Sequence, residues 1–139
     1  MPKFEYYGPV MGQARPRFTR AGRVYDPLAM KRHKAEIAAA YLEQVGVKFG
    51  GALEVSVHAY KPLPKRTPKR VTRKAWTSKP DADNIAKAVL DALNGVAWAD
   101  DAQVVRLEVH KHDRTRDLAE GLNIYIREVT ENESVEPGI

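Results

Sequence analysis

The chain has 139 residues, of which 43% are hydrophobic, and its net charge at pH 7 is +5. This length fits one domain with a sizeable core and leaves little room for a second. Because the chain contains no cysteine, disulfides, thiolate metal sites and cysteine nucleophiles are excluded, and any metal must bind oxygen or imidazole ligands. No run of about eighteen apolar residues and no secretory leader is present, which predicts a cytoplasmic protein without a membrane segment.

Charge is distributed unevenly along the chain. The last twelve residues contain four glutamates and no lysine or arginine, so the rest of the chain carries a net charge of +9. Such an excess on a small body predicts a polyanionic partner, above all nucleic acid. We expect residues 1–130 to form a single domain and residues 131–139, ENESVEPGI, to be an acidic, frayed tail.

The N-terminal segment favours β-structure. FEYYGPV contains the aromatic and β-branched residues typical of a strand, and Gly8 and Pro9 predict a bend at its end. RPRFTRAGRVYDP follows, and Ala21 and Gly22 between its two short polar-apolar stretches predict a hairpin or a folded loop.

A first helix is predicted to begin at Asp26 and Pro27, since aspartate can cap free backbone N–H groups and proline fits the first helical position. It should run to about Val45 and end at Gly46. Its expected apolar stripe consists of Ile37, Ala38, Tyr41, Leu42 and Val45.

A strand and a long basic loop come next. GALEVSVHAYK alternates apolar and polar residues, which predicts a half-buried strand. Residues 61–80 hold eight lysines or arginines, four prolines and no acid, so neither a helix nor a packed strand is expected there. Loops of this length without structure of their own are usually functional or disordered.

The last third of the chain predicts a second helix and two strands. Residues 82–95 place Ile85, Val89 and Leu93 on one helical face and Asp83 and Lys87 on the other. QVVRLEVHKH and GLNIYIREV then alternate as two strands, expected to be neighbours joined across DRTRDLAE. The order of elements predicts a single α+β domain, with one mixed sheet and two main helices packed on it.

The densest chemical signal is KPDADNIAKAVLDALNGVAWADDAQV, residues 79–104. Asp81 and Asp83 lie two residues apart at the start of the second helix, and Lys87 follows one turn after Asp83. Asp100 and Asp101 stand on a turn just before the next strand. Carboxylates that crowd together repel each other unless a cation neutralises them, and Mg²⁺ accepts carboxylates, waters and phosphate oxygens. This pattern with the basic loop beside it favours metal-assisted cleavage of a nucleic-acid backbone.

Each residue also has a simpler interpretation. Asp81 or Asp83 alone is more often a helix cap than a metal ligand, and Lys87 alone is more often a solvated ion-pair partner. Asp100 and Asp101 alone would be an ordinary turn. Two other protein classes stay open at this stage, a non-catalytic nucleic-acid-binding module and a D-x-D glycosyltransferase that holds a nucleotide sugar through a metal.

PDADNIAKAVLDAL followed by WADDAQV resembles the RusA family of Holliday junction resolvases, whose pattern is D-x-D-N-x-x-K, a helix, then D-D-x-x-V. The match is close from Pro80 to Val104 and looser elsewhere. It implies a RusA-like fold and a homodimer that cuts four-way DNA junctions symmetrically.

The resemblance also implies roles for individual residues. Asp81, Asp83 and Asp101 would bind Mg²⁺, for which Mn²⁺ is expected to substitute, and Lys87 would be the catalytic lysine. In the family, residues just before the first aspartate help to open the junction. Here they are Ser78, Lys79 and Pro80, which include no aromatic wedge, and Trp76 is the nearest substitute. The cations expected to contact DNA phosphates are Arg15, Arg17, Lys65, Arg66, Lys69, Arg70, Arg73, Lys74 and Lys79.

Overall fold

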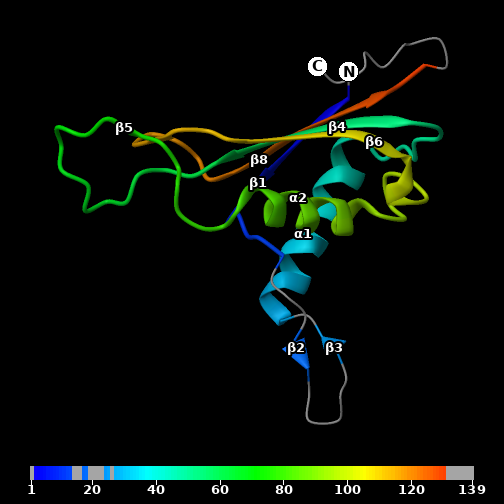
Figure 1. Ribbon diagram of the computed structural model, residues 1–139, viewed down its shortest axis with the longest axis horizontal. Helices are drawn as coiled ribbons and strands as arrows, with labels where there is room; N and C mark the ends of the chain where they lie inside the picture. Colours follow the sequence, from blue (N-terminus) through cyan, green and yellow to red (C-terminus); the bar gives the residue numbers. More distant parts are fainter. Residues whose placement is uncertain (1, 14–16, 19–23, 26, 131–139) are drawn as a thin grey trace.

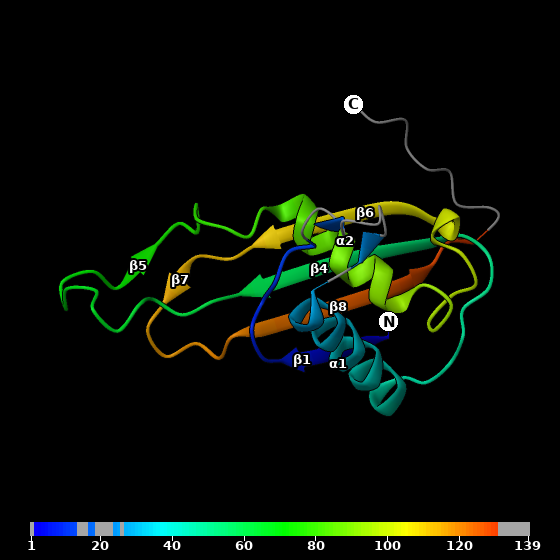
Figure 2. The same cartoon turned by 90° about the horizontal axis from the view of Figure 1, so that it is seen from below.

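The computed structural model describes residues 2–13, 17–18, 24–25 and 27–130, so the predicted tail, residues 131–139, lies outside the described residues. One layer is a four-stranded mixed sheet, and the second layer is a pair of helices on one face of it (Figures 1 and 2). In spatial order the strands are β1 (Lys3–Tyr7), β8 (Gly121–Glu128), β4 (Leu53–Tyr60) and β6 (Val104–Lys111). The helices are α1 (Leu28–Gln44) and α2 (Ala82–Leu93), which confirms the predicted α+β domain.

The core lies between the sheet and the two helices. Strand β4 buries every second side chain, and Val55 and Val57 are fully buried, as its alternation predicts. Helix α2 turns Ile85, Val89 and Leu93 toward the same core and leaves its polar face in solvent. This apolar face fixes the position of the helix that carries the predicted site.

Helix α1 differs from its prediction in the side chains that it buries. Its buried residues are Met30, His33, Ile37 and Tyr41, a row spaced three or four residues apart, as one helix face requires. Leu42 was predicted to be part of the apolar stripe, but it stands about 100° from this row and is 56% exposed.

The ends of α1 lie close to their predicted places. The carbonyl oxygen of Pro27 accepts hydrogen bonds from the first turn, while Asp26 lies outside the described residues. Gly46 ends the helix as predicted, because its φ of 75° is the left-handed conformation that glycine adopts freely.

The predicted pairing of the last two long strands was wrong. Strand β4 lies between β6 and β8, parallel to β6 and antiparallel to β8. The crossover through α2 allows the parallel pair, and β8 then returns along the other edge of β4. As a result β6 is an edge strand, and its apolar residues Val105 and Leu107 remain 55% and 39% exposed.

The basic loop is braced into an arm that extends beyond the sheet (Figure 2). We define the basic arm as residues 61–80 together with residues 113–118. A two-residue strand that was not predicted, β5 (Arg73–Lys74), pairs with β7 (Arg114–Thr115). The Arg116 guanidinium donates to the carbonyl oxygens of Thr67, Pro68 and Val71 at 3.1, 2.6 and 3.0 Å. These hydrogen bonds hold the backbone of the loop in one shape where it has no secondary-structure partners.

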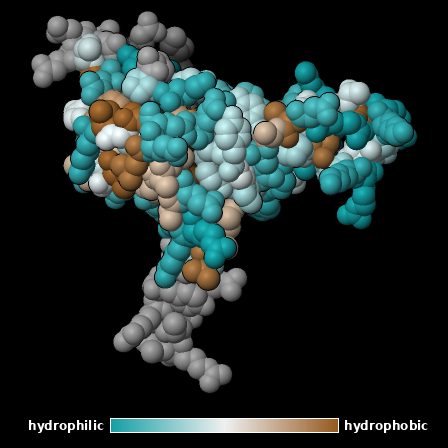
Figure 3. Space-filling model, turned by 180° about the vertical axis from the view of Figure 1, so that it is seen from behind, coloured by the Kyte–Doolittle hydropathy of each residue, from teal (hydrophilic) through white to brown (hydrophobic). Residues whose placement is uncertain are grey.

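The predicted hairpin is present, since β2 (Arg17–Phe18) and β3 (Val24–Tyr25) pair antiparallel; Ala21 and Gly22 lie outside the described residues. Within the described part of the chain, the helices are too short or too polar to cross a bilayer. Exposed apolar side chains form separate patches among hydrophilic ones on the face seen in Figure 3. Such scattered exposure is common on protein surfaces.

Candidate active site

The start of α2 presents the first two predicted carboxylates. Asp81 is the residue before the first helical turn, but its side chain makes no capping hydrogen bond, which argues against the simple capping interpretation. Asp83 lies in the first turn and Lys87 one turn later, both on the exposed face.

The turn after Trp98 separates the two neighbouring aspartates. Asp100 caps a short 3-10 helix, η1 (Asp101–Gln103), by accepting a hydrogen bond from the N–H of Ala102 at 3.0 Å. Asp101 points elsewhere, and its Oδ1 accepts a hydrogen bond of 2.8 Å from the indole N–H of the fully buried Trp98. The rigid indole therefore orients the Asp101 carboxylate.

Asp83, Lys87 and Asp101 line one hollow of about 520 Å³ between α2 and the edge strand β6. A further carboxylate, Asp91, also lines it and was not among the predicted site residues. We call this the acidic hollow. Its apolar lining consists of Ala86, Leu90, Leu107 and Val109. The two segments predicted to converge do meet here, and they bring an ammonium group with them.

Asp81 is held differently from the other two predicted ligands. It does not line the acidic hollow, and both of its carboxylate oxygens accept hydrogen bonds of 2.8 Å from Lys79 Nζ. Among the described residues, no group of three or more histidine or acidic side chains is arranged to hold a metal ion. The structure thus brings together two of the three predicted ligands and pairs the third with a lysine.

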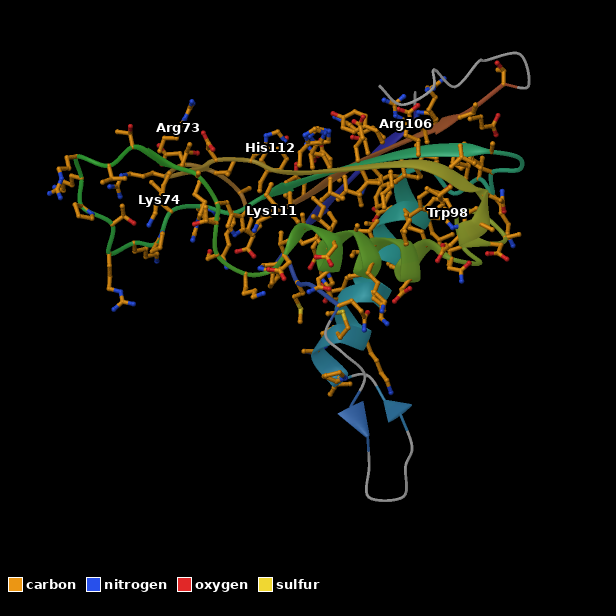
Figure 4. The ribbon with its side chains drawn as sticks, viewed as in Figure 1. Arg73, Lys74, Trp98, Arg106, Lys111 and His112 are labelled. Atoms are coloured by element: carbon orange, nitrogen blue, oxygen red, sulfur yellow. The ribbon has the colours of Figure 1, made fainter. Side chains whose placement is uncertain are left out.

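Lys111 braces the segment that leads to Asp81, and the sequence analysis missed it. Its ammonium donates to the carbonyl oxygen of Ser78 at 2.8 Å and stands 4.8 Å from the centre of the Trp76 ring (Figure 4). Burial lowers the pKa of Lys111, and the nearby Asp81 carboxylate partly offsets this effect. The sequence does single out Lys111. It stands where the alternation of Val105, Leu107 and Val109 would place a further apolar residue on the same face of the strand.

The N-terminal segment packs against the start of α2. The N–H of Gln13 donates to the carbonyl oxygen of Asn84 at 2.9 Å. A Cβ at Gly12 would stand 2.8 Å from Pro80 Cβ and 2.9 Å from Asn84 Cβ, so only glycine fits without displacement of a neighbour. Gly12 therefore helps to position the turn that carries Asp81 and Asp83.

The predicted DNA-contacting cations fall mainly on the basic arm. Lys65, Arg66, Lys69, Arg70, Arg73, Lys74 and Lys79 are all exposed. Arg15 and the side chain of Arg17 lie outside the described residues. Trp76 is only 5% exposed, so it packs in the core and does not serve as an exposed wedge. The arm is therefore a cationic surface attached directly to the segment that precedes Asp81.

Comparisons with known proteins agree with the site's sequence pattern. The family model of endodeoxyribonuclease RusA matches residues 7–127, which include both helices and the acidic hollow. A protein of Bacillus subtilis (strain 168), the uncharacterized protein YqaN, is 36% identical over 140 residues, which cover 92% of this chain and 96% of YqaN. The chain therefore belongs to the RusA family of endodeoxyribonucleases.

Proposed function

We propose that this protein is a Mg²⁺-dependent endodeoxyribonuclease that resolves four-way DNA junctions by paired nicks, with a role in DNA recombination and repair. The observation that carries the proposal is the acidic hollow, where Asp83, Asp101 and Lys87 converge beside a cationic arm. Membership of the RusA family supports the same reaction class. Phosphodiester cleavage needs positive charge near the phosphoryl oxygens and a route for DNA to an acidic site, and these features supply both.

The residues fit a hard divalent cation in their donor chemistry. Asp83 and Asp101 offer carboxylate oxygens to one hollow, and Asp101 is already oriented by Trp98. Asp81 could join them only by exchanging Lys79 for the cation, since that lysine now occupies both of its oxygens. Mg²⁺, or Mn²⁺ in its place, would supply the positive charge that polarises the phosphoryl group.

The protein's own groups then have separate tasks. The Lys87 ammonium in the hollow can stabilise charge that develops on the phosphoryl oxygens and can protonate the departing 3′ oxygen through a water molecule. The exposed cations of the basic arm contact phosphates on either side and carry no sequence information themselves. The braced shape of the arm reduces the entropy that ordering on DNA would cost.

We further propose that the protein acts as a homodimer. A four-way junction has near two-fold symmetry, and an isologous dimer presents two equivalent sites across such an axis. The pairing of the two nicks follows from this arrangement, because both sites engage the same junction.

A cleavage assay on a plasmid with an extruded cruciform tests the activity. A resolvase linearises the plasmid within one binding event, whereas an enzyme with one site leaves nicked circles that accumulate. We expect linear product with Mg²⁺, none with chelator, and none for Asp83→Asn, which should still bind the junction. Glu43→Gln, which removes one negative charge from an exposed position on α1, is the matched control and should cleave normally.

Two outcomes would contradict the proposal. Equal cleavage of linear duplex would make the protein a general nuclease. Full activity in Asp83→Asn, or no cleavage by the wild type under any condition, would favour a binding module in which the acids serve only structure.

A further inference from the structure

A second hollow lies where the basic arm leaves the sheet, and the proposed mechanism does not use it. Its volume is about 650 Å³, and residues of β4, β5, β6 and β7 line it. We call it the ring hollow. The side chains that matter for its chemistry are Tyr60, His110, His112, Arg73, Lys111 and Asp113.

Stacked rings form one wall of the ring hollow. The rings of Tyr60 and His112 are 4.5 Å apart and almost parallel, at 6°. His58 braces them from within the sheet, since its Nδ1 lies 2.8 Å from Nε2 of His112 and its ring stacks on His110 at 4.6 Å. The pair is therefore held in place before any ligand arrives, which reduces the entropy lost on binding.

Two cations, Arg73 and Lys111, stand beside the ring wall, together with the acid Asp113. The Arg73 side chain is 72% exposed, and its Nε lies 3.8 Å from the Asp113 carboxylate in a loose ion pair. Lys111 contributes to the same hollow, and burial lowers the pKa of His112, which favours its uncharged imidazole. A ring wall next to an exposed guanidinium suits a ligand with one planar base and one phosphate.

The ring hollow is adjacent to the acidic hollow. Val109 of the edge strand β6 lines both, so the two hollows meet across this strand. The side chain of Lys111 extends from β6 toward Ser78, in the segment that leads to Asp81 (Figure 4). A DNA strand bound at the acidic hollow would thus pass close to the ring hollow at the edge strand β6.

We propose that the ring hollow binds an unpaired nucleotide of branched DNA, with the base added to one end of the Tyr60–His112 stack and a phosphate on Arg73. This inference rests on the proposed function, because a base can enter the hollow only where it is unpaired, as at an opened crossover of the junction. A metal site is the competing interpretation of three close histidines, but these rings face one another, and no three ligands in the described part of the chain are arranged for a cation.

Binding in the presence of chelator tests the ring hollow independently of cleavage. Fluorescence anisotropy would compare a labelled single-stranded oligothymidine with a duplex of the same length, for the full chain and its variants. Tyr60→Leu should weaken single-strand binding at least about fivefold and change duplex binding by less than about twofold. Tyr60→Phe keeps the ring and should bind as the wild type does. The control is Tyr7→Leu, which removes an exposed ring from β1 at the opposite edge of the sheet.

Crosslinking of the wild-type protein covers the case in which Tyr60→Leu does not fold. An oligonucleotide containing 5-iodouracil should crosslink to the peptides that contain Tyr60 or His112. The inference would be overturned if Tyr60→Leu lost equal affinity for single strand and duplex, or if the crosslinks never included these peptides. A protein that binds single strands through Tyr60 but does not cut junctions would retain this site and lose only the proposed nuclease function.

Discussion

At the scale of single residues, neighbouring side chains of the same type perform different tasks. Asp100 closes a turn by capping η1, while Asp101 is turned into the acidic hollow by the Trp98 indole. The spacing D-x-D before an amphipathic helix was enough to predict where Asp83 would lie. It could not predict that Lys79 would hold Asp81 away from the hollow, because such a contact depends on the local path of the chain.

Removal of Lys79 should strengthen cation binding. In Lys79→Ala both oxygens of Asp81 lose their ammonium partner, so less free energy is needed to free this carboxylate for a metal. Because the pair is exposed, we expect Mn²⁺ affinity to rise only about two- to fivefold. Isothermal titration with Mn²⁺ measures this, and Lys65→Ala removes an equal charge from the arm as a control. An equal change of Mn²⁺ affinity in both variants would show that Asp81 does not contribute to the metal site.

At the scale of elements, the periodicity of the chain predicted α2 and β4 closely, because each has a strictly amphipathic pattern. The strand β5 and the bracing of the arm could not be predicted in this way. They depend on Arg114 and Arg116, which lie more than forty residues further along the chain and donate to backbone carbonyls. The order of the strands could not be predicted either, because alternation identifies a strand but not the strand with which it pairs.

The brace of the arm can be tested without a change of charge. Arg116→Lys keeps the positive charge but cannot span the carbonyls of Thr67, Pro68 and Val71, so the loop should lose its fixed shape and bind DNA more weakly. The slope of log affinity against log salt should stay as in the wild type. Lys69→Ala should instead reduce that slope by about one, the loss of one phosphate contact. Wild-type affinity in Arg116→Lys would show that the brace is dispensable for binding.

At the scale of the whole molecule, the sheet has two different faces. One face is covered by the helices and forms the core, and the other carries the histidines of β4 and β6. The sequence places these histidines at polar positions of two strands, yet only the parallel pairing of His58 with His110 brings their rings together. Their proximity has a consequence for stability.

The folded protein should lose stability as the pH falls from about 7.5 to 5.5. Burial lowers the pKa of His33, His58 and His112, so the unfolded chain binds more protons than the folded chain in the window below the ordinary histidine pKa. Denaturant unfolding at several pH values measures this loss. In His58→Gln the loss should be smaller, whereas a loss unchanged by that substitution would exclude His58 as a cause.

The central claim is that α2 and the turn after Trp98 deliver carboxylates to one shared cation. Titration of Mn²⁺ into the wild type, Asp83→Asn, Asp101→Asn and the control Glu43→Gln tests it most directly, since each variant removes one negative charge. We predict that Asp83→Asn and Asp101→Asn each weaken binding at least about tenfold, while Glu43→Gln binds as the wild type does. Mn²⁺ affinities that are the same in all four proteins would contradict the account.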